Sequence, residues 1–95
     1  MLLGKLKVIG HSMEPALKNN DVILISSILY LFKYPQINDI VAFRFNNKIL
    51  IKRISKNIEN KYFLEGDNSS DSYDSRKFGL IFRKDILGKV IFKLN

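Results

Sequence analysis

Residues Ile40–Ile54 read IVAFRFNNKILIKRI, and this stretch decides the fold. Its first six residues alternate between the two faces of a strand, with apolar side chains on one face. Asn46-Asn47 is a good turn for a β-hairpin, and apolar residues resume soon after it. The stretch therefore predicts two antiparallel strands joined by a tight turn, namely Ile40–Phe45 and Ile49–Ile54.

The second strand of this hairpin carries a lysine between aliphatic side chains. With a period of two, Leu50, Lys52 and Ile54 share one face. A lysine in this position either reaches water from the strand edge on its flexible stem, or it is desolvated and its pKa falls, which makes the neutral amine a base. The pattern alone leaves both interpretations open.

The chain has few groups that can serve as a nucleophile or as its base. It contains no cysteine, which excludes thiol nucleophiles, disulfides and cysteine-based zinc sites. Its single histidine, His11, directly precedes Ser12, and neighbouring side chains of an extended segment point to opposite faces. A Ser/His/Asp triad is therefore disfavoured, and a lysine remains as the base for Ser12. The alternative interpretation of Ser12 is a helix N-cap.

Several segments, in order along the chain, resemble the motifs of the signal peptidase I family, whose members use a Ser/Lys dyad. Ser12–Leu17 (SMEPAL) resembles the nucleophile motif Ser-Met-x-Pro-Thr-Leu, and Ile51–Ile54 resembles the segment with the lysine base. Asn20–Ile25 and Asn38–Phe43 resemble the two Gly-Asp-x-Val segments, with asparagine in place of glycine. Gly66–Gly79 resembles the box that begins Gly-Asp-Asn and continues Ser-x-Asp-Ser-Arg.

The resemblance implies a mostly β fold, a small antiparallel β-barrel of the signal peptidase and LexA-like catalytic-core type. Leu6–Ile9 would be its first strand, and Gly88–Leu94 would close the sheet. One short helix over about Met13–Leu17 would follow the nucleophile. Gly66–Gly79 would form a polar loop, and the aromatic-rich segment Ile28–Gln36 either lines a substrate groove or packs over one end of the barrel. We expect residues 1–95 to form a single peptidase catalytic core, with no second domain and no transmembrane anchor.

The same resemblance implies roles for individual side chains. Ser12 would attack, Lys52 would act as its base, and the backbone N–H of Ser12 would stabilise the oxyanion. Part of the family has a serine hydroxyl as second oxyanion donor where this chain has Gly10, so that donor would have to be backbone or water. Further residues implied are those that orient the lysine and hold the loop, Ser72, Asp74 and Arg76, and those that shape pockets for small residues before the cut, Val8, Ile9, Met13 and Ile51.

The composition and net charge of the chain restrict the classes of molecule that it is expected to bind. A hydrophobic share of 46% with 12% aromatics indicates a folded domain. The net charge is +7, but the lysines are scattered and no platform of interleaved aromatics and arginines is visible, which disfavours nucleic acid. An acidic protein substrate fits this charge. Asp67, Asp71 and Asp74 offer oxygen ligands for calcium, but their spacing lacks the calcium-loop pattern. We expect no metal and no cofactor.

The function expected from the resemblance is that of a serine endopeptidase that removes an N-terminal leader from a protein precursor. A core without an anchor is most similar to the soluble proteases that mature nickel-type superoxide dismutase. No apolar run approaches the roughly 20 residues of a membrane span, and no secretory signal is present, which predicts a cytoplasmic protein. The alternatives are a signal peptidase recruited to the membrane by a partner, and a non-catalytic or DNA-linked relative of the LexA-like proteins.

Overall fold

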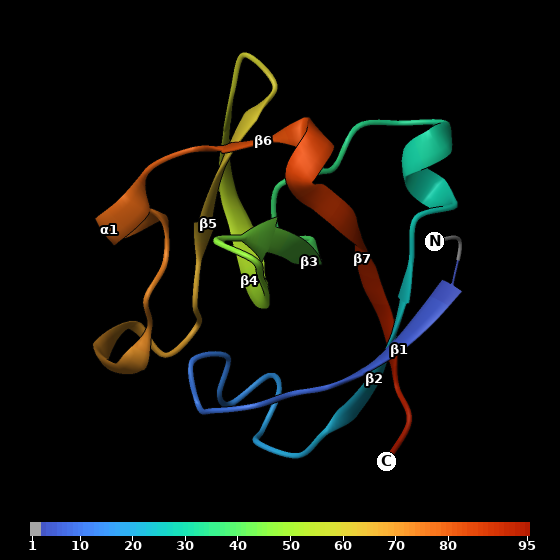
Figure 1. Cartoon of the computed structure of the whole chain (residues 1–95), viewed down its shortest axis with the longest axis vertical. Helices are drawn as coiled ribbons and strands as arrows, with labels where there is room; N and C mark the ends of the chain where they lie inside the picture. Colours follow the sequence, from blue (N-terminus) through green and yellow to red (C-terminus); the bar gives the residue numbers. More distant parts are fainter. Residues whose placement is uncertain (1–2) are drawn as a thin grey trace.

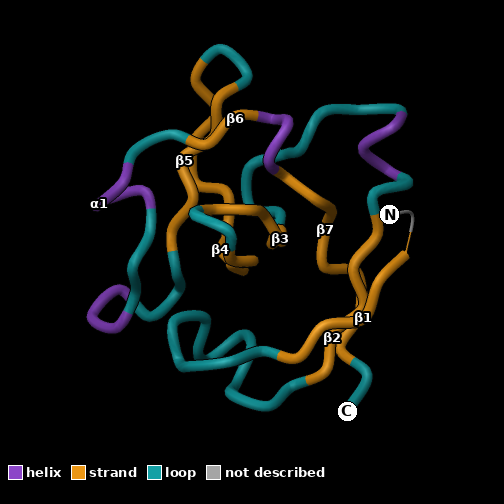
Figure 2. Tube along the Cα trace, in the orientation of Figure 1, coloured by secondary structure: helices purple, strands orange, loops and turns teal. Residues whose placement is uncertain are grey.

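The computed structural model describes residues 3–95, which form one antiparallel sheet (Figures 1 and 2). Its strands follow one another across the sheet in the order β1-β2-β7-β3-β4-β5-β6. The predicted mostly β, antiparallel class is therefore confirmed. The strands are β1 Leu3–Lys7, β2 Val22–Ser26, β3 Ile40–Phe45, β4 Lys48–Ile58, β5 Lys61–Glu65, β6 Ile81–Phe82 and β7 Ile86–Lys93.

The hairpin of β3 and β4 forms as the sequence predicts. Phe45 pairs with Lys48, and the two residues between them, Asn46 and Asn47, have φ angles of 49° and 63°. A two-residue type I′ turn needs positive φ at both central positions, and asparagine tolerates that conformation. This turn fixes the register of β4, and with it the face to which Lys52 points.

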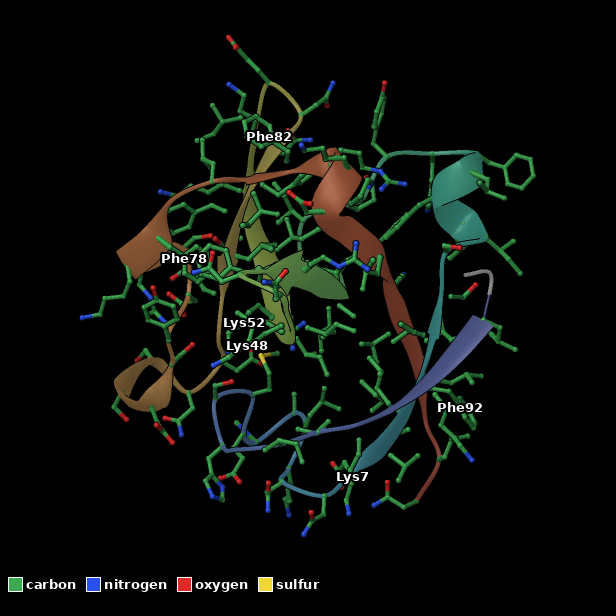
Figure 3. All side chains as sticks on the ribbon, viewed as in Figure 1. Lys7, Lys48, Lys52, Phe78, Phe82 and Phe92 are labelled. Carbon is green, nitrogen blue, oxygen red and sulfur yellow. The ribbon has the colours of Figure 1, made fainter. Side chains whose placement is uncertain are left out.

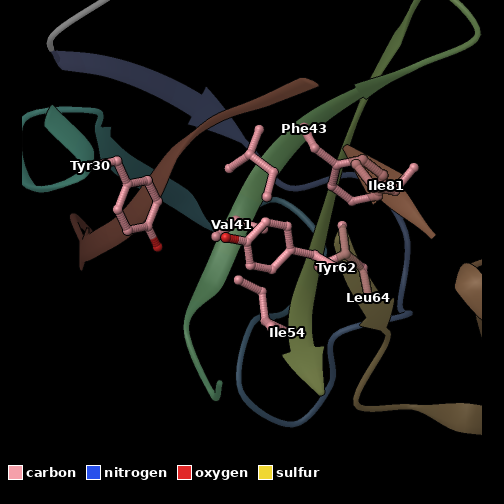
Figure 4. Packing of buried hydrophobic residues seen from close by; sticks show 8 residues of the cluster. Tyr30, Val41, Phe43, Ile54, Tyr62, Leu64 and Ile81 are labelled. Carbon is pink, nitrogen blue, oxygen red and sulfur yellow. The ribbon is translucent and has the colours of Figure 1, made fainter. Parts of the chain in front are cut away.

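Two clusters of buried side chains hold the sheet together. Figure 4 shows the larger cluster, in which side chains from β3, β4 and β5 gather around the ring of Tyr62. The smaller cluster attaches the turn after β1 to the sheet through Met13 and Leu17. The larger cluster consists of Tyr30, Val41, Phe43, Ile54, Tyr62, Leu64, Ile81 and Ile86, and the smaller one of Val8, Met13, Leu17, Ile23, Ile25 and Ala42.

The sheet does not close into the predicted barrel. β1 and β6 are its edge strands, and β4 pairs with β5 only from Arg53 onward. Within residues 3–95, no strand pairing joins Lys7–Ile9 to Ile49–Ile51; both segments border one pocket instead. Met13 and Lys52 also line that pocket, and both side chains are buried. The prediction of a closed barrel is wrong at the place where the two strand segments flank the pocket.

The predicted helix over Met13–Leu17 is also wrong. Residues 11–17 form successive turns, with hydrogen bonds from Glu14 N to His11 O at 3.2 Å and from Leu17 N to Met13 O at 3.0 Å. Met13 and Leu17 are buried in the smaller cluster, whereas the residues between them are half-buried or exposed. Packing at two anchor points therefore shapes this segment more strongly than helix propensity does.

Short helical turns occur elsewhere in the chain. The one in the aromatic-rich segment buries Tyr30 in the larger cluster, but Leu31, Phe32 and Tyr34 of that segment are exposed. None of its residues lines the pocket beside Lys52. Among residues 3–95, no helix has the length and apolar character needed to cross a bilayer. The helical turns are η1 Leu29–Leu31, η2 Ser69–Asp71, α1 Ser75–Phe78 and η3 Arg83–Asp85.

Candidate active site

The side chains of Ser12 and Lys52 meet although 40 positions separate them in the sequence. Ser12 lies in the turn segment after β1, and Lys52 points inward from the middle of β4 (Figure 3). The distance from Lys52 Nζ to Ser12 Oγ is 2.6 Å. Lys52 is only 5% exposed, so it does not reach water from a strand edge. The structure thus brings together the two residues that the sequence singles out as base and nucleophile.

The surroundings of Lys52 favour its neutral form. Burial lowers the pKa of the Lys52 amine below its ordinary value, because removal from water disfavours the charged form. The carboxylates of Asp74 and Asp71 oppose this shift, and the charge of Arg76 adds to it. Since burial dominates, a larger share of Lys52 is neutral near pH 7 than of an exposed lysine. A neutral amine at 2.6 Å can accept the proton of the Ser12 hydroxyl.

Asp74 is the centre of the network beneath the loop between β5 and α1. Its side chain is fully buried and accepts hydrogen bonds from Arg76 Nη2 at 2.6 Å, from Ser72 Oγ at 2.7 Å and from the Gly66 N–H at 2.8 Å. Burial opposes ionisation of this carboxyl, but the hydrogen bonds from Arg76, Gly66 and Ser72 outweigh burial and hold its pKa well below the usual range. Asp74 therefore remains an anion that ties the loop together.

Ser72 bonds a different partner from the one expected. The sequence predicts that its hydroxyl orients the amine of Lys52, whereas the hydrogen bond found in the structure runs from Ser72 Oγ to Asp74 Oδ2. Because the Ser72 hydroxyl donates its hydrogen bond to Asp74, it could only accept a hydrogen bond from the Lys52 amine. We infer that any influence of Ser72 on Lys52 is exerted through the position of the loop and the charge of Asp74.

Gly66 marks where this loop touches the backbone of Ser12. A Cβ atom at Gly66 would lie 2.7 Å from Ser12 O and would overlap the Ser72 hydroxyl, while the Gly66 N–H is fixed by Asp74. We expect Gly66→Ala to lower the free energy of unfolding by about 2 kcal/mol and kcat/KM by about 100-fold, because the backbone of Ser12 must move. Urea unfolding and peptide cleavage assays measure the two effects.

The control for this variant is Gly79→Ala. Gly79 has a positive φ, of 87°, which Gly66 does not, and nothing lies within 4 Å of an added Cβ atom at Gly79. This substitution is expected to cost about 1 kcal/mol through backbone strain alone and to leave kcat/KM unchanged. Equal losses of activity in the two glycine variants would show that contact with Ser12 is not the reason for the effect of Gly66→Ala.

Two further residues of the Gly-Asp-Asn sequence fix the loop to both halves of the site. The Asn68 N–H donates to Ser12 O at 2.8 Å, and Asn68 Nδ2 donates to His11 O at 3.1 Å. Asp67 accepts two hydrogen bonds from Arg53, which directly follows Lys52, at 2.8 and 2.9 Å. The loop therefore links the strand of the lysine to the turn of the serine. Sequence reasoning missed these contacts, because they depend on which backbones the fold brings together.

The oxyanion prediction is only partly compatible with the geometry. Gly10 adopts a φ of 92°, which suits glycine, and its N–H donates to Asn19 Oδ1 at 2.7 Å. The Gly10 amide is thereby engaged, so it does not supply a second oxyanion donor. In the described chain, residues 3–95, no acceptor is found for the N–H of Ser12, so this group is free to donate to an oxyanion.

A pocket of about 110 Å³ opens beside the two side chains. Its walls come from the end of β1 and the start of β4, and its floor contains the buried Met13. The small volume suits short side chains. All of the predicted pocket residues line it, together with the dyad and with three residues that were not predicted to line a pocket, Lys7, Ile49 and Leu50. The full lining consists of Lys7, Val8, Ile9, Ser12, Met13, Ile49, Leu50, Ile51 and Lys52.

Comparison with protein families places these features in a known group. Residues 3–91 match the sequence profile of the family described as Peptidase S24-like. The chain belongs to the Peptidase S24-like family. This assignment supports a serine peptidase-type function, and it covers both Ser12 and Lys52 as well as the loop that connects them.

A second comparison aligns part of the S24-like chain with a curated bacterial protein. Over 34 residues, 36% of the chain, it is 47% identical to Signal peptidase I of Buchnera aphidicola subsp. Baizongia pistaciae (strain Bp). The aligned stretch spans 11% of that relative. An S24- and signal-peptidase-like family is thus confirmed, while the nearer relation to nickel superoxide dismutase proteases remains a prediction.

His11 does not serve Ser12 in this S24-like site. Its Nδ1 lies 2.6 Å from Glu14 Oε2 on the surface, and the hydrogen bond with Glu14 raises the pKa of the imidazole. The side chain of His11 is 57% exposed. This geometry agrees with the prediction against a Ser/His/Asp triad, because the His11 ring pairs with Glu14, whereas Ser12 pairs with Lys52.

Proposed function

We propose that the protein is a serine endopeptidase in which Ser12 is the nucleophile and Lys52 its general base. The observation that carries this proposal is the contact of 2.6 Å between Ser12 Oγ and the amine of Lys52. Lys52 is only 5% exposed, and burial lowers the pKa of its amine. A serine hydroxyl needs an adjacent base, and a lysine can act as one only when it is neutral. The family membership supports the same reaction class.

In the proposed reaction, Ser12 Oγ bonds to the scissile carbonyl carbon while its proton passes to Lys52 Nζ. The N–H of Ser12 donates to the developing oxyanion. The C–N bond then breaks, and the proton moves from Lys52 to the leaving nitrogen, which departs as an amine and leaves an ester on Ser12. Lys52 next takes a proton from water, the resulting hydroxide attacks the ester, and the proton returns to Ser12 Oγ as the acid product leaves.

The substrate is proposed to bind as an extended strand between β1 and β4. In the hairpin, Phe45 and Lys48 are the pair nearest the turn, so alternation directs the backbone groups of Ile49 and Ile51 away from β3. On the other wall, the N–H of Val8 donates to Asp21 O and its C=O accepts from the Asn20 N–H, both just before β2. Alternation then directs the backbone groups next to Val8 toward the pocket, so both walls can bond a peptide backbone.

The proposed substrate is a protein precursor with an N-terminal leader, cut after small residues that fit the pocket of about 110 Å³. Val8, Ile9, Met13 and Ile51 shape that pocket. We take the precursor of a nickel-type superoxide dismutase as the first candidate, because the sequence resembles the soluble proteases that mature it, and we place the reaction in the cytoplasm. Cleavage there would expose the new N-terminus of the dismutase.

The decisive experiment incubates the purified protein with two substrates, a nickel dismutase precursor and a library of peptides from digested bacterial proteins. Mass spectrometry identifies new termini, and Ser12→Ala and Lys52→Ala serve as controls. Cleavage of the library but not of the precursor would reject the dismutase and retain the peptidase. Cleavage by both variants at the wild-type rate would reject the dyad.

A second candidate is a signal peptidase I-type leader peptidase that a partner brings to the membrane, favoured by the identity of 47% over 34 residues with Signal peptidase I. A secretory precursor in the same assay distinguishes it from the first. A non-catalytic LexA-like relative is the remaining alternative, and any Ser12-dependent cleavage would exclude it.

The rate should depend on pH through Lys52. Because the reaction needs the neutral amine, kcat/KM is expected to rise with pH as Lys52 loses its proton, with a midpoint below the ordinary lysine pKa of about 10.4. Asp71→Asn removes an exposed carboxylate that raises the pKa of Lys52, so its midpoint should move to lower pH. Cleavage rates at fixed ionic strength measure both profiles, and a flat rate from about pH 5 to 9 would contradict a lysine base.

A further inference from the structure

The pocket has two ends of different character. Its two walls are the end of β1 and the start of β4. Followed from the N-terminal side, one wall leads to Ser12 and the other to Lys52, and the contact between these two residues forms the near end of the pocket. At the far end lie Lys7, the last residue of β1, and Lys48, the first residue of β4. Figure 3 labels both, together with Lys52. Lys7 belongs to the pocket lining, Lys48 directly precedes the lining residue Ile49, and both lysines are exposed.

Neither of these lysines is neutralised by its neighbours. The strands β1 and β4, LGKLK and KILIKRISKNI, contain no acidic residue. Within the part of the chain that the structure describes, carboxylates pair with Lys89 and Lys93, whereas neither Lys7 nor Lys48 takes part in an ion pair. The far end of the pocket is therefore a site of positive charge on both walls.

The spacing relates this charge to the cut. Lys48 and Lys52 lie four residues apart on one face of β4, which corresponds to roughly 13 Å in an extended strand. Lys7 lies on the opposite, outward face of β1, where its neighbours in the pattern are also exposed. A bound strand alternates in the same way. When the residue before the cut occupies the pocket, the fourth residue before the cut points outward toward Lys7, and the fifth points inward toward Lys48.

We propose that the substrate carries an aspartate or glutamate at the fourth or fifth position before the scissile bond, and that Lys7 and Lys48 select it. This inference rests on the proposed function, since it uses the substrate strand that the dyad would cut. It narrows the substrate class to leaders that are acidic a short distance before small residues. The net charge of +7 supports the approach of such an acidic segment.

The test measures binding separately from cleavage. Three ten-residue peptides labelled with tetramethylrhodamine carry alanine at the first and third positions before the cut, and glutamate, glutamine or lysine at both the fourth and the fifth. Fluorescence anisotropy with Ser12→Ala gives their affinities. We expect the glutamate peptide to bind about threefold to tenfold more tightly than the glutamine peptide at low salt, and the lysine peptide to bind most weakly. The differences should shrink at 0.5 M salt.

Charge reversal provides the specific control. Adding Lys7→Glu and Lys48→Glu to the Ser12→Ala protein should invert the order of the peptides, whereas Lys84→Glu in η3, remote from the pocket lining, should preserve it. Any of three results would overturn the inference. These are equal affinities for all three peptides, no binding of any peptide at millimolar concentration, and an order of affinities that stays the same after the charge reversal. Absence of cleavage by the protein with Ser12 intact would count instead against the proposed peptidase, because the binding order is measured without cleavage.

Discussion

Lys52→Met is expected to lower kcat/KM by at least about 1,000-fold while leaving the protein as stable as the wild type or more so. The loss follows because methionine fills the same space but cannot take the proton of Ser12. The stability follows because Lys52 is 5% exposed and its amine is desolvated, so an apolar side chain of similar shape removes a burial penalty. The gain is about 1 kcal/mol.

Cleavage of a peptide found in the library screen and urea unfolding at pH 7 measure the two effects. Lys56→Met is the matched control, because Lys56 lies four residues further along β4 but is exposed. It should keep both activity and stability. A purely structural role for Lys52 predicts the opposite result, a less stable variant with proportionate activity. If Lys52→Met keeps a tenth or more of the wild-type kcat/KM, Lys52 is not the base.

The sequence predicts the parts of the fold that depend on local pattern. Alternation and the asparagine pair give the β3–β4 hairpin, because register in a hairpin is set by its turn and by the buried face. The same alternation places Lys52 on the buried face. It does not show that Ser12 is the residue opposite, because that contact depends on how segments 40 positions apart are packed. The resemblance of motifs, not periodicity, supplied this pairing.

The predictions that differ from the structure concern the helix after Ser12, the closed barrel and the partner of Ser72. Most of these differences depend on packing between distant segments, which a local sequence pattern does not show. The turns after Ser12 follow from the burial of Met13 and Leu17, which overrides a weak tendency to form a helix. The barrel stays open because two strand segments border a pocket rather than pair. Ser72 bonds Asp74, two residues along the chain, and such short-range bonds compete with more distant partners. That last signal was present in the sequence, as a serine two positions before an aspartate.

The loop explains why residues that do not touch the substrate should matter. Asp74 holds Gly66, Gly66 lies against the backbone of Ser12, and Asn68 bonds the same backbone. Movement of the loop is thus transmitted to the serine. At the same time the charge of Asp74 raises the pKa of Lys52, against the effect of burial. One carboxylate therefore influences both the backbone position of Ser12 and the pKa of Lys52, the two residues of the proposed dyad.

Asp74→Asn is expected to lower the free energy of unfolding at pH 7 by about 3 kcal/mol and to reduce kcat/KM strongly. The amide cannot accept all the hydrogen bonds that Arg76, Ser72 and the Gly66 N–H donate to a buried carboxylate, so donors are left without partners. Asp71→Asn in the same loop is the matched control, because its side chain is exposed, and it should change stability by less than about 0.5 kcal/mol.

The pH dependence distinguishes loss of this charge from general damage to the loop. The pKa of Asp74 is lower in the folded than in the unfolded protein, so its stabilisation is complete above the ordinary carboxyl pKa of about 4 and is lost as the pH falls toward the depressed value. The difference in unfolding free energy between wild type and Asp74→Asn should therefore be constant from pH 8 to 5 and should narrow below about pH 4. A difference that stays the same down to about pH 2 would mean that the shape of the side chain, and not its charge, holds the loop against Ser12.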